Sequence, residues 1–381
     1  VLHRPLPPLA AIRSLDAGAL ARAVRQPSRA MLDGIEVRYV RYVSPPRPWS
    51  YGSWGLWAAP ALAIALRSLR QEFAFEVVHA HYAVPAGDAV RRVAPHVPLV
   101  VSVHGGDVYA TSAGLIGAQA VAKTLKHARL VLANSGGTAR RCKDHGARAT
   151  RVVHLGADIT PPDPPRAPGP PQPVAQPQPR PAAQPQPPPQ PTLTTVGHLI
   201  PRKRHADVIS ALARLSPRHP DLGYLIIGDG PERERLKAHA RSLGVADRVE
   251  LRGQLPPKQV AKSAREATLF VLPSVDEAFG VAYIEAMAGG VPAIGCRSED
   301  GPEEIAANGG GIVLVPPNDP DALAAEIDAL LSDPDRRAVL GREAAATVKR
   351  AFTWEQCGRE TMAAYREASQ DTNLRTATHQ V

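Results

Sequence analysis

Two carboxylates, Glu277 and Glu285, stand eight positions apart and could hold a ligand that is rich in hydroxyl groups. An apolar run typical of a buried strand ends shortly before them, and ligands of parallel α/β sheets bind beyond the carboxyl ends of strands. Gly280 would let the backbone approach such a ligand, and the N–H groups of Phe279, Gly280 and Val281 could bind an anion. Carboxylates accept hydrogen bonds from sugar hydroxyls. The stretch therefore predicts a nucleotide-sugar site, against the alternative of acidic residues scattered over an ordinary strand-loop-helix unit.

Short apolar runs alternate with Ala-rich stretches along the chain, which predicts parallel α/β sheets. The expected strands lie near residues 35–43, 76–80, 98–103, 129–133 and 151–154 in the first half, and near residues 193–197, 223–228, 248–252, 269–272, 291–295 and 312–315 in the second. Between the halves, residues 161–191 hold 16 of the 40 prolines and should be extended and disordered, as a spacer or as a partner-binding tract. A helix is expected from residue 352 to residue 368, with a frayed end after Gln370.

Composition limits the possible classes of protein. A chain of 381 residues has room for two domains. Its three cysteines are far apart and odd in number, which argues against a disulfide framework and fits a reducing compartment. No signal peptide or membrane-spanning run is visible, so we expect a cytoplasmic protein. The formal charge of +9 favours anionic nucleotide donors and an anionic membrane surface as partners, because no nucleic-acid-binding module accompanies it.

Aromatic and basic residues are concentrated in one part of the first half. Residues 49–57 hold three of the four tryptophans, and Arg67 and Arg70 follow on an apolar stretch. The segment could enter a membrane interface, grip a glycan or pack in the core. His79 and His81 share one expected strand; we expect them on opposite faces and therefore expect no metal site.

These motifs resemble those of the family-4 retaining glycosyltransferases of GT-B fold, also called glycosyl transferases group 1. The resemblance extends from about residue 35 to the end and rests on Val77–Tyr82, Val101–Asp107, Val153–Asp158, Val196–Ile209 and Leu225–Glu232, besides the Glu277–Glu285 stretch. It implies two Rossmann-like domains facing across a cleft. The implied bounds are 1–160 for the acceptor-side domain, 161–191 for an interdomain insertion, 192–350 for the donor domain and 351–381 for a returning helix and tail. The family's opening strand, Gly-rich loop and helix are expected to be missing before residue 35, which makes this domain N-terminally incomplete.

The resemblance also assigns roles to individual residues. His104, Glu277 and Lys203 are implied to be catalytic. The implied donor-binding residues are His198, Arg202, Gly228, Arg252, Phe279, Gly280, Val281 and Glu285. Those on the acceptor side are Gly105, Asp107, Asn134 and Ser135, although Asn134 and Ser135 could equally cap a helix. The family usually has Arg at the position of His198, which is a weaker, pH-dependent cation.

The implied reaction is retaining transfer of a sugar, with a UDP-sugar as the expected donor, to a glycan or lipid-linked acceptor in surface polysaccharide or glycolipid synthesis. Lys203 and helix N-terminal amides would stabilise the leaving phosphate, so neither a metal nor another cofactor is expected. A glycosidase would use the two carboxylates differently and would need no cationic loop. Two alternatives stay open: a nucleotide-sugar epimerase of the same fold, and an inactive nucleotide-sugar-binding protein.

Overall fold

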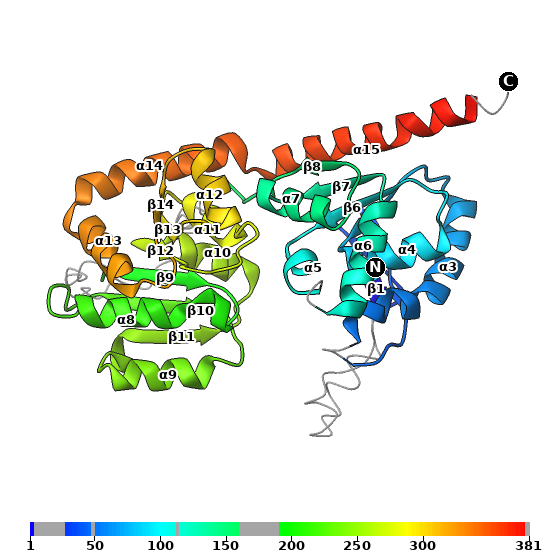
Figure 1. The fold of residues 1–381 in the computed structure, drawn as a ribbon. Helices are drawn as coiled ribbons and strands as arrows, with labels where there is room; N and C mark the ends of the chain where they lie inside the picture. Colours follow the sequence, from blue (N-terminus) through cyan, green and yellow to red (C-terminus); the bar gives the residue numbers. More distant parts are fainter. Residues whose placement is uncertain (4–26, 47–49, 112–113, 160–189, 378–381) are drawn as a thin grey trace, which may run out of the picture. The chain divides into compact units, whose positions relative to one another are not determined.

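The structure, a computed structural model, describes residues 1–3, 27–46, 50–111, 114–159 and 190–377, with side chains up to residue 370. The chain divides into two compact units. Unit 1 comprises Val1–His154 and Cys357–Val381, and unit 2 comprises Leu155–Gln356. Each unit is built on its own parallel β-sheet with packed helices (Figure 1). The Pro-rich segment 161–191 lies outside the described residues except for its last two positions.

The main sheet of unit 1 has four parallel strands in the order β5-β6-β7-β8. Their bounds are Val78–His81, Leu99–Val103, Leu130–Ala133 and Thr150–Val152. β6 and β7 are buried throughout, because their Val and Leu side chains meet helices on both faces. One face packs against α3 (Trp54–Glu72), α4 (Asp88–Val93) and α6 (Leu115–His127), and the other against α15 (Trp354–Ala377). Two further helices, α5 (Gly106–Tyr109) and α7 (Gly136–Asp144), follow β6 and β7.

Among the described residues, four short strands precede this sheet. β1 (Leu2–His3) pairs in parallel with β4 (Val40–Arg41), and β2 (Arg29–Leu32) forms an antiparallel hairpin with β3 (Ile35–Arg38). The hairpin turns at Asp33 and Gly34, which both have positive φ, as a two-residue Asp-Gly turn requires. The prediction of one strand over residues 35–43 with no strand before it is therefore wrong. This run is divided between β3 and β4, which belong to two different sheets, and their partners β2 and β1 precede it in the sequence.

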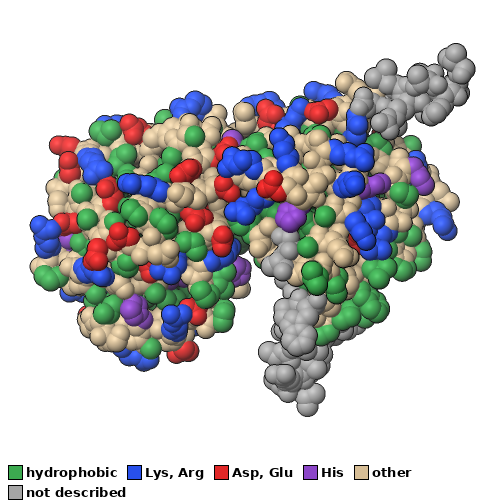
Figure 2. Space-filling model, viewed as in Figure 1, with side chains coloured by type: hydrophobic (Ala, Val, Ile, Leu, Met, Phe, Trp, Pro, Cys, Tyr) green, Lys and Arg blue, Asp and Glu red, His purple; other side chains and the backbone are tan. Residues whose placement is uncertain are grey.

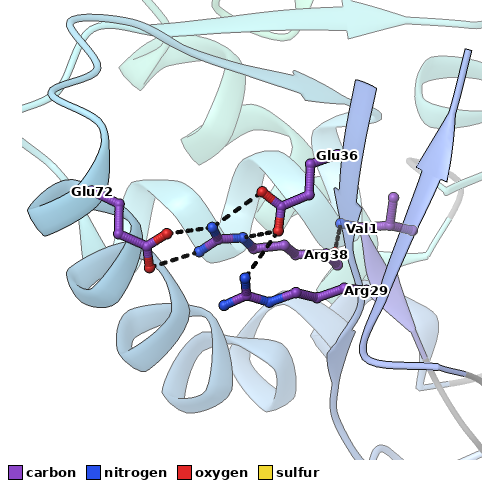
Figure 3. Close-up of polar contacts among 5 residues, drawn as sticks. All are labelled: Val1, Arg29, Glu36, Arg38 and Glu72. Carbon is purple, nitrogen blue, oxygen red and sulfur yellow. Dashed lines mark hydrogen bonds and ion pairs between the residues drawn. The ribbon is translucent and has the colours of Figure 1, made fainter. Parts of the chain in front are cut away.

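Ion pairs tie the hairpin to the end of α3 (Figure 3). Arg38 lies between two carboxylates: its Nη2 is 2.5 Å from Glu72 Oε2 and its Nε is 3.0 Å from Glu36 Oε1. Arg29 adds a contact of 3.2 Å to Glu36. The four side chains are partly or largely exposed, so these pairs fix the position of the hairpin more than they add to stability.

The sheet of unit 2 has six parallel strands in the order β11-β10-β9-β12-β13-β14. In chain order from β9, their bounds are Thr192–Val196, Gly223–Ile227, Val249–Gly253, Leu269–Val271, Ala293–Cys296 and Ile312–Val315. The helices α8 to α14 are His205–Leu215, Arg233–Ser242, Pro257–Arg265, Val281–Met287, Asp300–Ala307, Pro320–Ser332 and Pro334–Ala351. The strands expected in the two main sheets are confirmed, each to within two residues. The strand order reverses between β9 and β12, which in such sheets marks the crevice where ligands bind.

The last helix, α15, continues to Ala377, so the expectation of a frayed end after Gln370 is wrong. Neither Gly nor Pro stands between Gln370 and Ala377 to end the helix. From Cys357 on, α15 belongs to unit 1, where the hydroxyl of Tyr365 lies 2.6 Å from Nδ1 of His79. Within the described ranges, no helix is both long and apolar enough to cross a membrane.

Candidate functional site

Two loops of unit 2 meet at the carboxyl ends of β9 and β12, where the strand order reverses. The loop after β9 carries Arg202 and Lys203, and the loop after β12 carries Glu277. Lys203 Nζ lies 2.5 Å from Glu277 Oε2, and Arg202 Nη1 lies 3.9 Å from the same oxygen. The N–H of Val275 also donates to the carbonyl of Arg202 at 2.8 Å. The structure thus brings together three of the predicted site residues from two distant parts of the sequence.

Glu277 is held on several sides. Its side chain is 8% exposed and that of Lys203 is 11% exposed. The hydroxyl of Ser274 donates to Glu277 Oε2 at 2.8 Å, and the N–H of Glu277 donates to Glu299 Oε2 at 2.9 Å. The sequence did not identify Ser274 or Glu299: Ser274 lies three residues before the recognised Glu277–Glu285 stretch, whereas no sequence signal links Glu299 to it. Because the Lys203–Glu277 pair is poorly solvated, an anionic ligand would compete strongly for Lys203.

Gly280 forms the turn into α11. Its φ of +84° is unfavourable for other residues, and a Cβ there would lie 2.5 Å from the ring of Tyr283. In the described part of the chain, nothing accepts a hydrogen bond from the N–H of Gly280 or Val281. The side chain of Phe279, by contrast, is buried in the core. The side chain of Phe279 is therefore not available to a ligand, and the predicted role of its backbone N–H stays a prediction.

Glu285 lies inside α11 and is half-buried. Burial raises the pKa of its carboxyl above the usual range, and the charge of Arg265 opposes this effect. Among the described residues, no group donates a hydrogen bond to Glu285. The carboxylate is therefore desolvated and still able to accept hydrogen bonds from a ligand.

The two Gly-rich turns beside this site touch one another. Gly228 has a φ of +143°, and a Cβ there would lie 2.0 Å from the carbonyl oxygen of Gly197. The exposed His198 follows Gly197, with its Nδ1 3.4 Å from the carbonyl oxygen of Asp229. The side chain of Arg252 pairs with Glu250 at 2.6 Å, so we expect its backbone rather than its guanidinium to meet a ligand.

A buried hydrogen-bond chain supports the loop between His198 and Lys203. His205 Nε2 lies 3.2 Å from the carbonyl oxygen of His198, and His205 Nδ1 lies 3.3 Å from the hydroxyl of Tyr224. That hydroxyl is 2.8 Å from Thr195 Oγ1. Burial lowers the pKa of His205 to about 4, so this residue supports the loop without adding a charge. Sequence reasoning did not identify this series of hydrogen bonds.

In unit 1, His104 follows β6 and contacts a second imidazole. His104 Nε2 lies 3.0 Å from Nδ1 of His81. Burial, aided by the nearby His81, lowers the pKa of His104 to about 4, so it is neutral at physiological pH. The rings of His79 and His81 have centroids 4.5 Å apart, so the prediction that they lie on opposite faces is wrong: residues two apart on a strand share a face. Among the described residues there is still no group of three or more His, Cys, Asp or Glu that could hold a metal ion.

Asp107 lies buried beneath His104. Its carboxylate accepts hydrogen bonds from the N–H groups of Ala83 at 2.9 Å and of His104 at 3.4 Å. Burial raises the pKa of Asp107 to about 6, although these N–H groups act in the opposite direction. Gly105, with a φ of +94°, begins the turn that joins His104 to α5. Asp107 therefore supports the backbone of the His104 loop.

The loop after β7 carries the other two acceptor-side candidates. Ser135 caps α7, since its Oγ accepts a hydrogen bond from the N–H of Thr138 at 3.1 Å. Asn134 is buried, and its Oδ1 has no partner among the described residues. Capping thus accounts for Ser135, whereas Asn134 retains an acceptor for a hydroxyl group.

Two family models match the chain. The one described as Glycosyltransferase Family 4 matches residues 17–161, and the one described as Glycosyl transferases group 1 matches residues 179–347.

Curated relatives match different shares of the chain. A D-inositol 3-phosphate glycosyltransferase of Acidothermus cellulolyticus is 30% identical over 94% of this chain and 83% of its own length. An exopolysaccharide phosphotransferase of Streptomyces coelicolor is 40% identical over 37% of this chain and 15% of its own. A GDP-mannose-dependent alpha-(1-6)-phosphatidylinositol monomannoside mannosyltransferase of Mycolicibacterium smegmatis is 35% identical over 40% of this chain and 41% of its own. The chain thus spans less than half the length of the last two relatives.

Solved structures share the fold at low sequence identity. Sucrose-phosphate synthase from Thermosynechococcus elongatus has a TM-score of 0.70 at 20% identity, covering 90% of this chain and 86% of its own. The HepE protein of Anabaena, solved with UDP and glucose, has a TM-score of 0.66 at 18% identity, covering 93% and 89%. These likenesses confirm the predicted GT-B fold class.

Proposed function

Because this chain belongs to glycosyltransferase family 4, we propose that it transfers a sugar from a nucleotide sugar to a hydroxyl group of a glycan or lipid-linked acceptor, with retention of configuration. Unit 2 would bind the donor, and His104 and its neighbours in unit 1 would serve the acceptor. The observation that carries the proposal is the contact of Lys203 with Glu277 at the reversal of the strand order, beside the helix that carries Glu285.

Each part of a nucleotide sugar has a counterpart in unit 2. The diphosphate would bind Lys203, Arg202 and the N–H groups of Gly280 and Val281. The ribose hydroxyls would donate to Glu285, and a hydroxyl of the transferred sugar would donate to Glu277. The diphosphate would draw Lys203 away from Glu277, which frees Glu277 for the sugar.

The chemical step forms a bond between the acceptor oxygen and the anomeric carbon and breaks the bond from that carbon to the phosphate oxygen. The acceptor proton goes to the departing phosphate oxygen, on the face where the phosphate leaves. Lys203, Arg202 and the helix amides would stabilise the charge that develops on the phosphate. We propose that these groups suffice without a metal ion.

For the donor we propose a UDP-sugar, which the HepE complex with UDP and glucose supports by fold likeness alone. GDP-mannose is a second candidate, which the name of the mycobacterial relative supports. In either case the base would meet the backbone of Gly228 and Arg252.

Unit 1 carries the positive charge of the chain. It has 23 Lys and Arg against 11 Asp and Glu, a formal charge of +12, whereas unit 2 has 22 against 25, or −3. On the face shown in Figure 2, basic side chains gather on unit 1 and mix with acidic ones on unit 2. The donor unit is therefore not the source of the basic charge, contrary to the expectation that nucleotide donors explain it. We propose that unit 1 meets an anionic acceptor environment such as a membrane surface.

One helix of unit 1 suits such a surface. Leu56, Trp57 and Ile64 of α3 are exposed, and Arg67 and Arg70 follow on the same helix. Trp54 is buried in the core, so only part of the aromatic segment faces out; Trp49 lies outside the described residues. Sedimentation with phosphatidylglycerol vesicles, absent with phosphatidylcholine and reduced by Trp57→Ser, is the expected result.

The donor site is tested by thermal unfolding with UDP, GDP and ADP. A nucleotide at 100 times its Kd should add about 2.7 kcal/mol to the stability of unit 2. Glu285→Ala should abolish the shift, while Glu234→Ala, at an exposed carboxylate of α9, should retain it. A shift that persists in Glu285→Ala would refute the assignment of the site.

Turnover separates the proposal from its alternatives. Release of UDP from UDP-glucose, or of GDP from GDP-mannose, that increases with acceptor indicates a transferase. The named relatives are transferases, which disfavours the epimerase. A nucleotide-dependent shift with no turnover for any donor and acceptor would indicate the inactive binding protein.

A further inference from the structure

A hollow of about 970 Å³ opens in unit 1, and the ring of one lining residue, Tyr82, contacts that of His104. The hollow lies between the segment before α3, Tyr82 after β5, and described residues within 106–111 and 114–117. The described residues that line it include Tyr51, Tyr82, Thr111, Gly114, Leu115 and Ile116. The sequence analysis named the segment 49–57, which supplies Tyr51, as a possible glycan contact, but it did not identify Tyr82 as a site residue.

Tyr82 is presented to the hollow by a strained backbone. Its φ is +74°, which is unusual for a bulky residue. Hydrogen bonds hold this conformation: the N–H of Tyr82 donates to Ser102 at 2.9 Å, and its carbonyl accepts from Gly87 at 3.1 Å. Tyr82 is 44% exposed, and its ring centroid lies 5.1 Å from that of His104. Strain of this kind persists where the surrounding structure imposes it, often at ligand sites.

The lining carries no charge. Among the described lining residues there is no Lys, Arg, Asp or Glu. The nearby Asp107 is buried and already accepts hydrogen bonds from two backbone N–H groups. Leu115 and Ile116 are 85% and 61% exposed at the rim. A phosphate or carboxylate would find no cation in this lining, whereas an uncharged ring with C–H faces could pack on the tyrosines.

We propose that this hollow holds an uncharged glycosyl residue of the acceptor, with its ring against Tyr82, so that one of its hydroxyls lies toward His104. The proposal rests on the proposed function and narrows it. The acceptor end bound here would be a neutral sugar rather than the phosphorylated inositol in the name of the Acidothermus relative.

Glycines allow the hollow to be filled without damage to the fold. A Cβ at Gly114 would meet nothing within 4 Å, and the backbone there is extended, with a φ of −101°. Gly114→Leu should therefore fold and occupy the place of the sugar ring. Gly358, on α15 of the same unit, also has open space around its Cβ and lies outside the hollow. Gly358→Leu is thus the matched control.

Binding is measured by saturation-transfer NMR on the full chain, with the methyl hexopyranosides of glucose, galactose and mannose and with D-inositol 3-phosphate as probes. We expect saturation transfer to at least one methyl hexopyranoside and none to D-inositol 3-phosphate. Gly114→Leu and Tyr82→Ala should each weaken the binding by at least about tenfold. The leucine would fill the place of the sugar ring, and the alanine would remove the aromatic ring on which the sugar packs. Gly358→Leu should bind as the unaltered chain does.

Three results would overturn the proposal: no saturation transfer to any hexopyranoside, equal binding by Gly114→Leu, or binding of D-inositol 3-phosphate that Gly114→Leu abolishes. Failure of the proposed function gives a different pattern, in which hexopyranosides bind but no nucleotide shifts the unfolding of unit 2 and no donor is turned over. In that case the hollow would be a sugar site without the acceptor role.

Discussion

Replacing Asp107 by Asn tests how much free energy it costs to bury this carboxylate beneath the His104 loop. Asp107 is 1% exposed, and burial raises its pKa to about 6, against an ordinary value of 3.8. Between these two pH values the unfolded chain binds fewer protons at this site than the folded chain, so stability falls as pH rises through the range. At 1.36 kcal/mol for each unit of pKa difference, the ionised carboxylate costs about 3 kcal/mol above pH 6.

The side chain of Asn does not titrate, so the variant should escape this cost. The free energy of unfolding of Asp107→Asn minus that of the unaltered chain should increase by about 3 kcal/mol from acid to neutral pH, with about half of the increase between pH 5 and pH 7.5. Urea unfolding followed by tryptophan fluorescence suits the test, because three of the four tryptophans belong to unit 1 and Trp354→Phe removes the fourth.

The test depends on whether the difference in free energy of unfolding increases or decreases with pH. The same difference at pH 5 and pH 7.5 would mean that Asp107 does not titrate between those values and that its burial does not penalise the ionised carboxylate. A difference that decreases with pH would mean that the N–H groups of Ala83 and His104 stabilise the carboxylate more than burial penalises it.

Three further outcomes are expected. Glu285→Gln should raise the Tm at pH 7 and lose this gain near pH 4, because burial raises the pKa of Glu285, while the nucleotide-dependent shift disappears; a lower Tm at pH 7 would contradict this. Tyr224→Phe should cost about 1–3 kcal/mol in urea unfolding, because it leaves buried partners such as His205 unsatisfied, and a neutral effect would show that they find others. Arg38→Ala should leave the Tm almost unchanged but speed proteolysis of the β2–β3 hairpin, and a large fall in Tm would show that its pair with Glu72 matters beyond the surface.

The main sheets could be predicted because their strands are continuous buried runs, such as Leu99–Val103 and Leu269–Val271. The hairpin of unit 1 was missed for the opposite reason. Met31, Leu32 and Ile35 are exposed, so apolar character gave no periodic signal there, although Asp33-Gly34 is a typical hairpin turn.

The candidate site, too, could be predicted only in part. The residue types of Glu277, Glu285 and Lys203 predicted their chemistry. The contact between Lys203 and Glu277, however, depends on the strand order, which pairs β9 with β12. Glu299 and Tyr82 were missed because their roles come from tertiary contact and from backbone conformation, which local pattern does not encode.

The order of the strands in unit 2 also bears on how the chain folds. Lys203 and Glu277 are 74 positions apart, and their contact forms only when β12 joins the first strand of the sheet. Contacts of such separation require the closure of a long loop and tend to form late. A nucleotide bound across these two loops would then add contacts that are absent from the folding transition state. It would slow the unfolding of unit 2 and leave its folding rate nearly unchanged, so donor supply would govern the lifetime of the folded unit.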